Sequence, residues 1–525
     1  MVRFLRNIFS GYFLIVLILL LELGLLIFFD FFLDNVLPYI IQTGDSKADV
    51  TIAEIIYATG RFIVVVFTIL TFFKIVNKPE NPEFKIPWIV GMMILPLFTI
   101  SVYIIFGNHG LRKKEKAIVL SSKNAIEKHL PKDDYKEELG RAYGAFNYIN
   151  NVTKLGIRKN NRVKYYADGE TFFPELIKEL KKAEEFIFIE FFIISDGELW
   201  SDVLRILKIK AAQGVEVRLI YDDMGCSGTI DSNTPKKLAQ SGIKCFKFHP
   251  FKPILSGMYN NRDHRKIVII DHKMAFTGGM NLADEYANLQ IRFGYWKDTM
   301  VKIEGSAINN LICTFLQNYD LASNEVSDYN KYLSYDYPQY DEEGFVMPFG
   351  DGPGSIDDAL VGEQTYINLL TYAQRRVDIS TPYLVPTYSL IDALRNAALR
   401  GVEVNLIVPG IPDKKIVYNL AKSNFRYLLD AGVNIYIYKP GFNHMKTALA
   451  DDELAFVGTI NFDFRSLVHH FECGTILYKN PCIKDISEDF KIMINESQKV
   501  PADYKMTNIF ARTLCSVLKV FSALF

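Results

Sequence analysis

The sequence repeats itself, and this repeat restricts the fold more than any other feature. Strand-like stretches at 184–194 and 215–221 flank a helical pattern at 199–214, and the same order returns at 375–385, 389–401 and 402–408. The tetrapeptide Gly-Val-Glu-Val occurs at 214 and again at 401, and "SGIKCFKF" (241–248) is echoed by "AGVNIYIY" (431–438). Several matches in one order indicate two copies of one unit. Because strands alternate with helices, we expect an α/β fold: two tandem α/β domains, a pseudo-twofold duplicate with mixed sheets flanked by helices.

Each copy carries the same polar motif, His-x-Lys-x4-Asp, followed by a small-residue turn that ends in asparagine. The residues of the motif and turn are His264, Lys266, Asp271, Gly279 and Asn281 in the first copy, and His444, Lys446, Asp451, Thr459 and Asn461 in the second. The interval from histidine to asparagine is 17 residues in both, and the copies lie 180 residues apart. A motif repeated with its turn at a fixed offset indicates a functional site.

The types of residue indicate phosphoryl chemistry. Residues two apart in a strand share a face, so His264 and Lys266 point to one side while Asp271, of opposite parity, braces the scaffold. Two such faces together give two imidazoles, two ammonium groups and two amides, which suit an anion. One histidine attacks phosphorus and the other acts as general acid and base, while the lysines and asparagines hold the phosphate oxygens. No carboxylate cluster suited to Mg²⁺ or Zn²⁺ accompanies the motifs, so we expect neither a metal nor another cofactor.

Charge and cysteine usage narrow the class of partner. The chain has 59 basic and 60 acidic residues, so nothing in its net charge favours nucleic acid. Its six cysteines form no Cys-x-x-Cys pair, which predicts buried or idle thiols in a reducing compartment.

The N-terminal part predicts a membrane region. Apolar runs at 12–33, 52–73 and 88–106 each approach the ~20 residues that a spanning helix needs. Lysines and arginines at 74–85 and 112–116 favour the cytosolic side for both flanks of the third run, so we expect that run, with Pro96 at its middle, to be a re-entrant or interfacial hairpin. The main domain then lies on the cytosolic face. The expected divisions are 1–110 membrane region, 111–164 basic membrane-proximal connector, 165–325 first domain, 326–355 linker, 356–503 second domain and 504–525 apolar or amphipathic C-terminal helix.

With these motifs in place, the chain resembles the phospholipase D superfamily, whose mark is a duplicated HxKx4D motif, and within it the bacterial cardiolipin synthases. The stretches 81–108, 264–286 and 458–472 carry the closer resemblance. The resemblance implies that His264 forms a phosphohistidine and His444 is the general acid and base, although the near-symmetric motifs leave this order open. It also implies an acid behind each histidine, with Glu472 placed for His444 and Asp298 for His264. Gly279 and Thr459 stand where the superfamily often has serine, and we expect both to support phosphate binding.

The resemblance implies a multi-pass cell-membrane enzyme of bacterial type that joins two phosphatidylglycerol molecules into cardiolipin and glycerol. The alternatives are a membrane phospholipase D, a phosphatidyltransferase with another acceptor alcohol, and a non-enzymatic scaffold that binds anionic lipid. The expected partners are phosphatidylglycerol, cardiolipin and the lipid bilayer, with no nucleic acid. The oligomeric state is not set by the sequence, and a homo-oligomer is among the states it allows.

Overall fold

The computed structural model describes residues 46–107, 110–131, 134–250, 260–338, 340–353, 359–506 and 508–522. These form two compact units: an N-terminal unit, and a main unit of Gly110–Phe251 and Asn260–Leu518. We describe each by itself. The expected apolar segment 12–33 lies outside the described residues.

In the described part of the N-terminal unit, the helices are α4 (Ser46–Val76), α5 (Pro82–Ile94) and α6 (Pro96–Phe106). Among the described residues, only Ala58–Val76 within α4 is long and apolar enough to cross a membrane. The third run is not one continuous helix, because Leu95 before Pro96 leaves the helical conformation. The two halves fold back on each other, with the rings of Trp88 and Tyr103 5.3 Å apart. The break at Pro96 agrees with the sequence prediction, whereas several spanning helices are not established.

The first copy in the main unit is a seven-stranded mixed sheet of order β2-β9-β7-β6-β3-β4-β5. Its strands are β2 (Arg162–Tyr166), β3 (Phe186–Phe191), β4 (Glu216–Asp222), β5 (Lys244–Phe248), β6 (Lys266–Ile270), β7 (Met274–Gly278) and β9 (Met300–Glu304). Its helices are α10 (Gly169–Leu180), α11 (Glu198–Ala212), α12 (Thr234–Ala239) and α13 (Ile308–Ser323), with short 3₁₀ turns η3 (Asp284–Ala287) and η4 (Tyr329–Lys331). All six residues of β3, "FIFIEF", are buried, as expected of a central strand.

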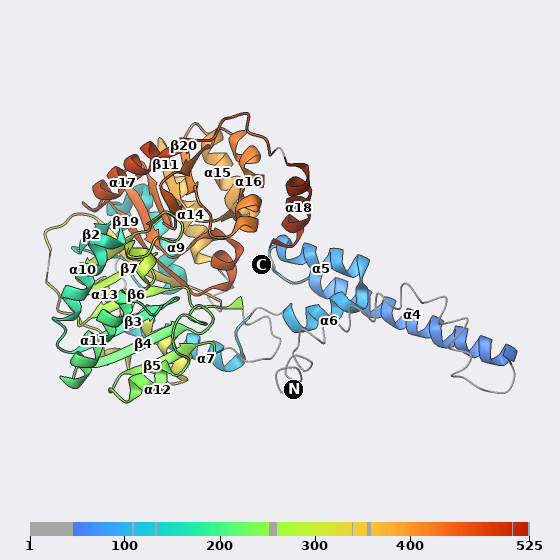
Figure 1. Cartoon of the computed structure of the whole chain (residues 1–525), viewed down its shortest axis with the longest axis horizontal. Coiled ribbons are helices and arrows are strands. Elements are labelled where there is room, and N and C mark those ends of the chain that lie inside the picture. The colour runs from blue at the N-terminus through green and yellow to red at the C-terminus, as the bar shows by residue number, and fades with distance from the viewer. Residues whose placement is uncertain are drawn as a thin grey trace. The chain divides into compact units, whose positions relative to one another are not determined.

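The second copy is built on a nine-stranded sheet of order β1-β10-β19-β17-β16-β11-β13-β14-β20. Its strands are β1 (Arg158–Lys159), β10 (Phe345–Asp351), β11 (Arg376–Ser380), β13 (Glu403–Pro409), β14 (Asn434–Tyr438), β16 (Thr447–Ala450), β17 (Leu454–Gly458), β19 (Glu472–Tyr478) and β20 (Ser497–Lys499). Its helices are α14 (Val361–Tyr372), α15 (Tyr388–Leu399), α16 (Lys415–Leu429) and α17 (Ile483–Asn495). Figure 1 shows this copy, mainly in orange and red, beside the first, mainly in green.

The strand orders confirm the duplication. The run β9-β7-β6-β3-β4-β5 corresponds to β19-β17-β16-β11-β13-β14, with parallel and antiparallel neighbours in the same places. The matched helices α11 and α15 are followed by Gly214 and Gly401, both at φ +92°, a conformation that glycine adopts without a steric penalty. Strands β7 and β9 contact β17 and β19, so the two copies pack through their sheets.

The expected linker is wrong. The segment 326–355 was expected to be a linker, but β10 within it pairs with β19 along all seven of its residues. The stretch "FVMPFGD" contains proline and glycine and no clear alternation, so its pattern predicts a loop, whereas its partner strand supplies the order. The connector 111–164 is also folded: it contains α7 (Lys113–His129), α8 (Lys136–Leu139), η1 (Gly140–Ala142), α9 (Tyr143–Thr153) and β1, which pairs with β10.

Short elements complete the main unit. They are β8 (Tyr295–Lys297), β12 (Leu384–Val385), β15 (Gly441–Asn443), β18 (Phe462–Asp463) and the π-helix η6 (Arg465–His469). Near the end of the chain, α18 (Ile509–Val520) forms where an apolar helix was expected, with Phe510, Leu514 and Val517 exposed. All six cysteines are buried.

Candidate active site

The two histidine-lysine segments meet where the copies join, because each is paired with a segment of the other copy. The backbone N–H of His264 donates to the carbonyl of Phe471 at 2.8 Å, and the N–H of His444 donates to the carbonyl of Lys297 at 2.7 Å. Strand β15, just before His444, runs parallel to β8 of the first copy. Each histidine therefore lies beside the residue that precedes an acid of the other copy.

The acids consequently cross between copies. The Nδ1 atom of His264 lies 2.9 Å from Oε2 of Glu472, and Nδ1 of His444 lies 2.5 Å from Oδ2 of Asp298. The expected pairing, Glu472 with His444 and Asp298 with His264, is wrong. Sequence distance suggested partners within one copy, but the cross-copy strand pairs bring each acid to the opposite histidine.

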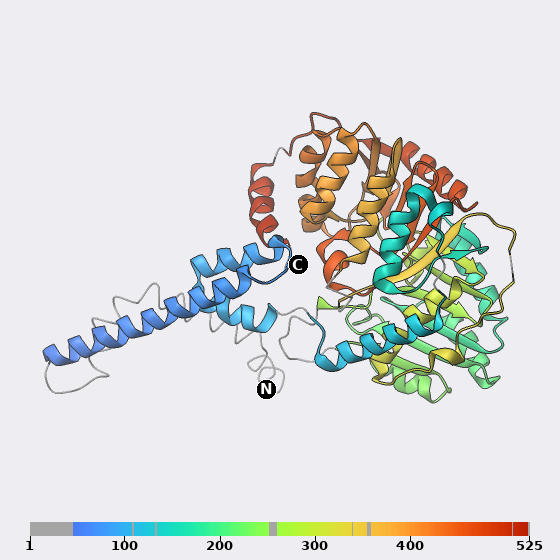
Figure 2. The same cartoon turned by 180° about the vertical axis from the view of Figure 1, so that it is seen from behind.

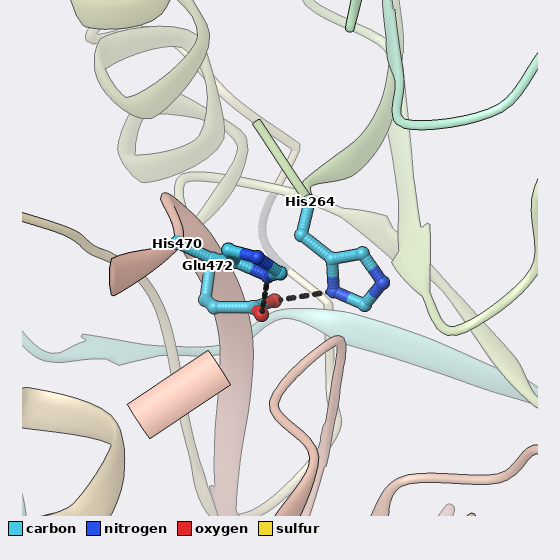
Figure 3. Close-up of side chains that lie close together, drawn as sticks. All are labelled: His264, His470 and Glu472. Atoms are coloured by element: carbon cyan, nitrogen blue, oxygen red, sulfur yellow. Dashed lines mark hydrogen bonds and ion pairs between the residues drawn. The ribbon is translucent and has the colours of Figure 1, made fainter. Parts of the chain in front are cut away.

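Glu472 is held by several donors. Its carboxylate accepts hydrogen bonds from Oγ of Ser466, at 2.6 Å, and from the hydroxyl of Thr459. Nδ1 of His470 lies 3.5 Å from its Oε1 atom. Figure 3 shows the rings of His264 and His470 reaching the same carboxylate. The hydroxyl of Thr459 therefore positions Glu472 rather than a phosphate.

Asp298 occupies the equivalent place with a different neighbour. A Cβ atom on Gly279 would lie 2.0 Å from Oδ1 of Asp298, so the aspartate fills the space that a side chain at position 279 would need. The backbone N–H of Gly279 donates to Thr299 at 2.8 Å and that of Thr459 to Cys473 at 2.9 Å. The expected phosphate contacts of Gly279 and Thr459 are therefore not seen: both residues shape the support of an acid.

The two lysines lie at the centre and are fully buried. Lys266 Nζ donates to the carbonyl of His264 at 2.5 Å, and Lys446 Nζ lies 2.6 Å from Nδ1 of His444 and 3.6 Å from Asp298. Burial lowers the pKa of Lys266 to about 8, although Glu472 opposes the shift. Burial likewise lowers the pKa of Lys446 to about 7, with Asp298 opposing it and Lys266 adding to it. An anionic substrate would restore the charge balance of this cluster.

The same cluster depresses the pKa of both histidines. Burial, with the positive charges of Lys266 and Lys446, holds the pKa of His264 well below its usual value. Burial and Lys446 lower the pKa of His444 to about 4, although Asp298 opposes the shift. Both imidazoles are therefore held toward their neutral form in the absence of a substrate. Both are nearly buried, at 6% and 7% exposure, so the site is shielded from water.

The two asparagines differ. Asn281 is fully buried; its Oδ1 accepts from the N–H of Ile193 at 3.0 Å and its Nδ2 donates to the hydroxyl of Tyr286 at 2.6 Å. Its amide therefore joins loops and is not offered to a phosphate, contrary to the expectation. Oδ1 of Asn461 is buried and has no hydrogen-bond partner within the described residues. An amide oxygen accepts hydrogen bonds, so Oδ1 could receive a substrate hydroxyl, and only Nδ2 of Asn461 could donate to a phosphate oxygen.

The motif aspartates brace the strands, as their parity predicts. Asp271 accepts the backbone N–H groups of Glu184, Glu185 and Phe186, at the start of β3. Asp451 does the same for residues 374–376, at the start of β11. Burial opposes ionisation of Asp451, but these backbone donors hold its pKa below the usual value.

His264, His470 and Glu472 place three atoms within 4.8 Å of one another, a separation at which a metal ion could be held. Two buried lysines and the use of Glu472 as a hydrogen-bond acceptor oppose a cation there. His470 and Ser466 were missed by the sequence reasoning. The π-helix η6 creates their positions, and no strand or helix period in "RSLVHHFE" reveals it.

Two profiles of known protein families match this chain. A family profile described as "Cardiolipin synthase, PLD-like domain" matches residues 176–312 and 366–494, and one described as "Phospholipase_D-nuclease N-terminal" matches 63–108. The chain belongs to the cardiolipin synthase, phospholipase D-like family. Its motif sites at 264–271 and 444–451 lie one in each matched range.

Named relatives cover most of the chain. It is 32% identical over 433 residues to cardiolipin synthase 2 of Bacillus cereus, covering 81% of this chain and 83% of the relative. It is 34% identical over 457 residues to a cardiolipin synthase of Clostridium perfringens, covering 85% and 95%. The crystal structure of a Haemophilus influenzae phosphatidylserine synthase superposes with a TM-score of 0.55 at 14% identity, over 73% of this chain and 97% of that one, which shows the shared fold.

These findings establish a phosphatidyltransferase of the cardiolipin synthase type within the phospholipase D superfamily. The N-terminal profile and the apolar helix α4 together indicate membrane association.

Proposed function

We propose that the enzyme makes cardiolipin and glycerol from two phosphatidylglycerol molecules through a phosphatidyl-histidine intermediate. The proposal rests on two buried histidine-acid pairs, His264–Glu472 and His444–Asp298, which surround two buried lysines. Relatives that match most of the chain are named cardiolipin synthases, which supports this pair of substrates over others.

In the first half-reaction, Nε2 of His264 attacks the phosphorus of one phosphatidylglycerol, and the bond from phosphorus to the glycerol head group breaks. The negative charge of the bound phosphate, together with Asp298, favours the protonated form of His444. This imidazolium gives its proton to the leaving alkoxide, so glycerol departs neutral. Glu472 stabilises the positive charge on the phosphorylated imidazole. Lys266, Lys446 and the amide of Asn461 hold the non-bridging phosphate oxygens.

In the second half-reaction, neutral His444 accepts the proton of a head-group hydroxyl of the second phosphatidylglycerol. The hydroxyl oxygen attacks phosphorus, the bond to His264 breaks, and cardiolipin leaves. His444 ends protonated and His264 neutral, so the enzyme returns to its starting state. The shielded site disfavours water, while the membrane concentrates the lipid acceptor.

The assignment of roles rests on the difference between the two pairs. Glu472 shares its charge among Ser466, Thr459 and His264, whereas Asp298 lies closer to its histidine, at 2.5 Å against 2.9 Å. A more closely paired imidazole holds a proton better and suits the acid, and the imidazole whose acid is shared among more donors suits the neutral nucleophile. This supports His264 as nucleophile and His444 as acid and base.

The membrane placement is part of the proposal. We propose a multi-pass cell-membrane protein with its catalytic unit on the cytosolic face, with 88–106 as a re-entrant or interfacial hairpin and α18 as an interfacial helix. A reporter fused after Phe106 that works only outside the membrane would contradict this orientation.

The experiment is a product analysis with the purified full-length protein in mixed micelles. Phosphatidylglycerol labelled in its acyl chains and in its head group is supplied, and lipids and free glycerol are quantified. Cardiolipin and glycerol in equal amounts support the proposal. Phosphatidic acid indicates hydrolysis, a new phospholipid formed only with added serine or ethanolamine indicates another acceptor, and binding without turnover in the wild type indicates a scaffold.

A further inference from the structure

A cavity in the main unit is lined on one side by Phe471, the residue before Glu472. It has a volume of about 200 Å³ and is enclosed by helices α7, α9 and α13 and the end of β10. All of α7 and all of α9 fall between the stretches matched by the two family profiles, and neither helix supplies a residue to the catalytic site. Both helices, cyan to teal, face the viewer in Figure 2.

One face of α7 gives the cavity its chemistry. Lys116, Val119, Leu120, Lys123 and Ile126 all line it, and their spacing of three and four residues places them on one side of the helix. Val119 and Ile126 are buried, whereas Leu120 is 58% exposed. The inner lining therefore includes hydrocarbon, and the two lysines belong to the same helix face.

The opposite wall continues the apolar surface. Val152 and Leu155 come from α9 and the loop after it, and Val361 and Phe471 come from the second copy. The cavity volume of about 200 Å³ leaves room for part of an acyl chain.

We propose that this cavity is a second anionic-phospholipid site, which takes an acyl chain between α7, α9 and α13 and the lipid phosphate at Lys116 and Lys123. The proposal goes beyond the proposed function, because the cavity is separated from the catalytic histidines by the wall of Phe471. The occupant is a lipid rather than a soluble anion because the lining is largely apolar, and an anionic one because helix α7 is rich in lysine.

The wall links this site to the catalytic acid. Phe471 lines the cavity, and its carbonyl accepts the backbone N–H of His264. The fully buried Arg265 donates to the carbonyls of Thr314 and Asp351, both cavity-lining residues, and through Nε to the carbonyl of Glu472 at 2.9 Å. A bound acyl chain would pack against residues whose backbone carbonyls Arg265 joins to Glu472.

The test is photolabelling of the full-length protein in micelles by phosphatidic acid with a diazirine in one acyl chain, followed by peptide mapping. We expect label in peptides of α7, α9 and α13. Lys116→Gln and Lys123→Gln should each reduce that label about five-fold, because one basic residue strengthens the binding of an anionic lipid by about 1 kcal/mol, a factor of about five. Lys128→Gln is the matched control, because Lys128 is exposed on the same helix and does not line the cavity.

Two comparisons separate this site from catalysis and from general membrane contact. His264→Ala abolishes turnover in the proposed mechanism and should leave the labelling unchanged, so a failure of the proposed function does not affect this test. A phosphatidylcholine probe of the same chain should label these peptides several-fold less. Equal labelling by both probes, label unaffected by either lysine variant, or label absent from α7, α9 and α13 would each overturn the proposal.

Discussion

Replacing Glu472 by its amide should slow a different chemical step from the one slowed by replacing Asp298, because the two acids contact different histidines. Glu472→Gln keeps the shape of the side chain but removes the charge that His264 contacts at 2.9 Å, and Asp298→Asn does the same for His444 at 2.5 Å. A hydrogen bond to a charged group contributes about 1.5–3 kcal/mol. Since about 1.4 kcal/mol is a factor of ten in rate, each variant should lose about 10- to 150-fold in turnover of phosphatidylglycerol.

The two variants should separate when the leaving group no longer needs a proton. With a phosphatidyl ester of p-nitrophenol, the leaving phenolate departs unprotonated, so the first half-reaction needs the nucleophile but not the acid. We expect the burst of p-nitrophenolate in Asp298→Asn to approach the wild-type rate. In Glu472→Gln the burst should remain slowed by about the factor seen with phosphatidylglycerol. Stopped-flow absorbance of the first turnover measures both.

Variants of the two histidines test which one is the nucleophile and which one is the acid. His444→Ala should retain the burst with the p-nitrophenyl ester, and His264→Ala should abolish it. If His264→Ala keeps the burst and His444→Ala loses it, the roles of nucleophile and acid are reversed. If the histidines behave as expected but Glu472→Gln is rescued and Asp298→Asn is not, the crossed pairing of acids is refuted.

Three further predictions follow from neighbouring contacts. Gly279→Ala should lose activity at least as strongly as Asp298→Asn, because its Cβ would lie 2.0 Å from that carboxylate; normal activity with an unshifted unfolding temperature would contradict the packing. Asp271→Ala leaves three backbone donors of β3 without their acceptor and should lower the free energy of unfolding by about 3 kcal/mol, whereas Asp271→Asn should cost less than half of that, as denaturant unfolding in micelles would show. Burial lowers the pKa of Lys446 to about 7, so this lysine is charged below that pH and neutral above it, and kcat/KM should fall as the pH rises through about 7–8. In Lys446→Arg the fall in kcat/KM should move to higher pH, because arginine stays charged. A fall at the same pH in this variant would exclude Lys446 as its cause.

Much of the architecture could be predicted because it depends on local pattern and repetition. The matched patterns predicted β3, α11, β4, α15 and β13 within three residues at each end, whereas the strand predicted at 375–385 ends five residues earlier, at Ser380. Strand parity separated Asp271 from His264 and Lys266, and the hydrogen bonds of Asp271 to 184–186 agree with that separation. A period of two residues is a property of any strand, so it needs no knowledge of the partner strand.

The incorrect predictions all concern features that depend on tertiary contacts. Asn281 has the residue type of a phosphate ligand, but the N–H of Ile193 and the hydroxyl of Tyr286 take up its amide. Strand β10 has a loop-like sequence, and pairing with β19 makes it a strand. The acids could not be assigned from spacing, since 28 or 34 residues along the chain carry no information on which copy the segment before each acid will join.

The two copies share a fold but not the support of their acids, and in the proposed mechanism this difference gives identical motifs different roles. In one half, glycine at 279 leaves room for the shorter Asp298, which contacts its histidine directly, accepts the backbone N–H of Thr299 at 2.8 Å and lies 3.6 Å from Lys446 Nζ. In the other, Thr459 and Ser466 donate to the longer Glu472 and draw its charge away from His264. An acid with concentrated charge favours a protonated imidazole, and one with dispersed charge favours a neutral imidazole that becomes cationic only on phosphorylation. Thr459→Val should therefore concentrate the charge of Glu472 on His264 and raise the pKa of that histidine. The acid limb of the p-nitrophenolate burst would then move to higher pH, while an unmoved limb would show that the hydroxyl of Thr459 does not set the difference between the two histidines.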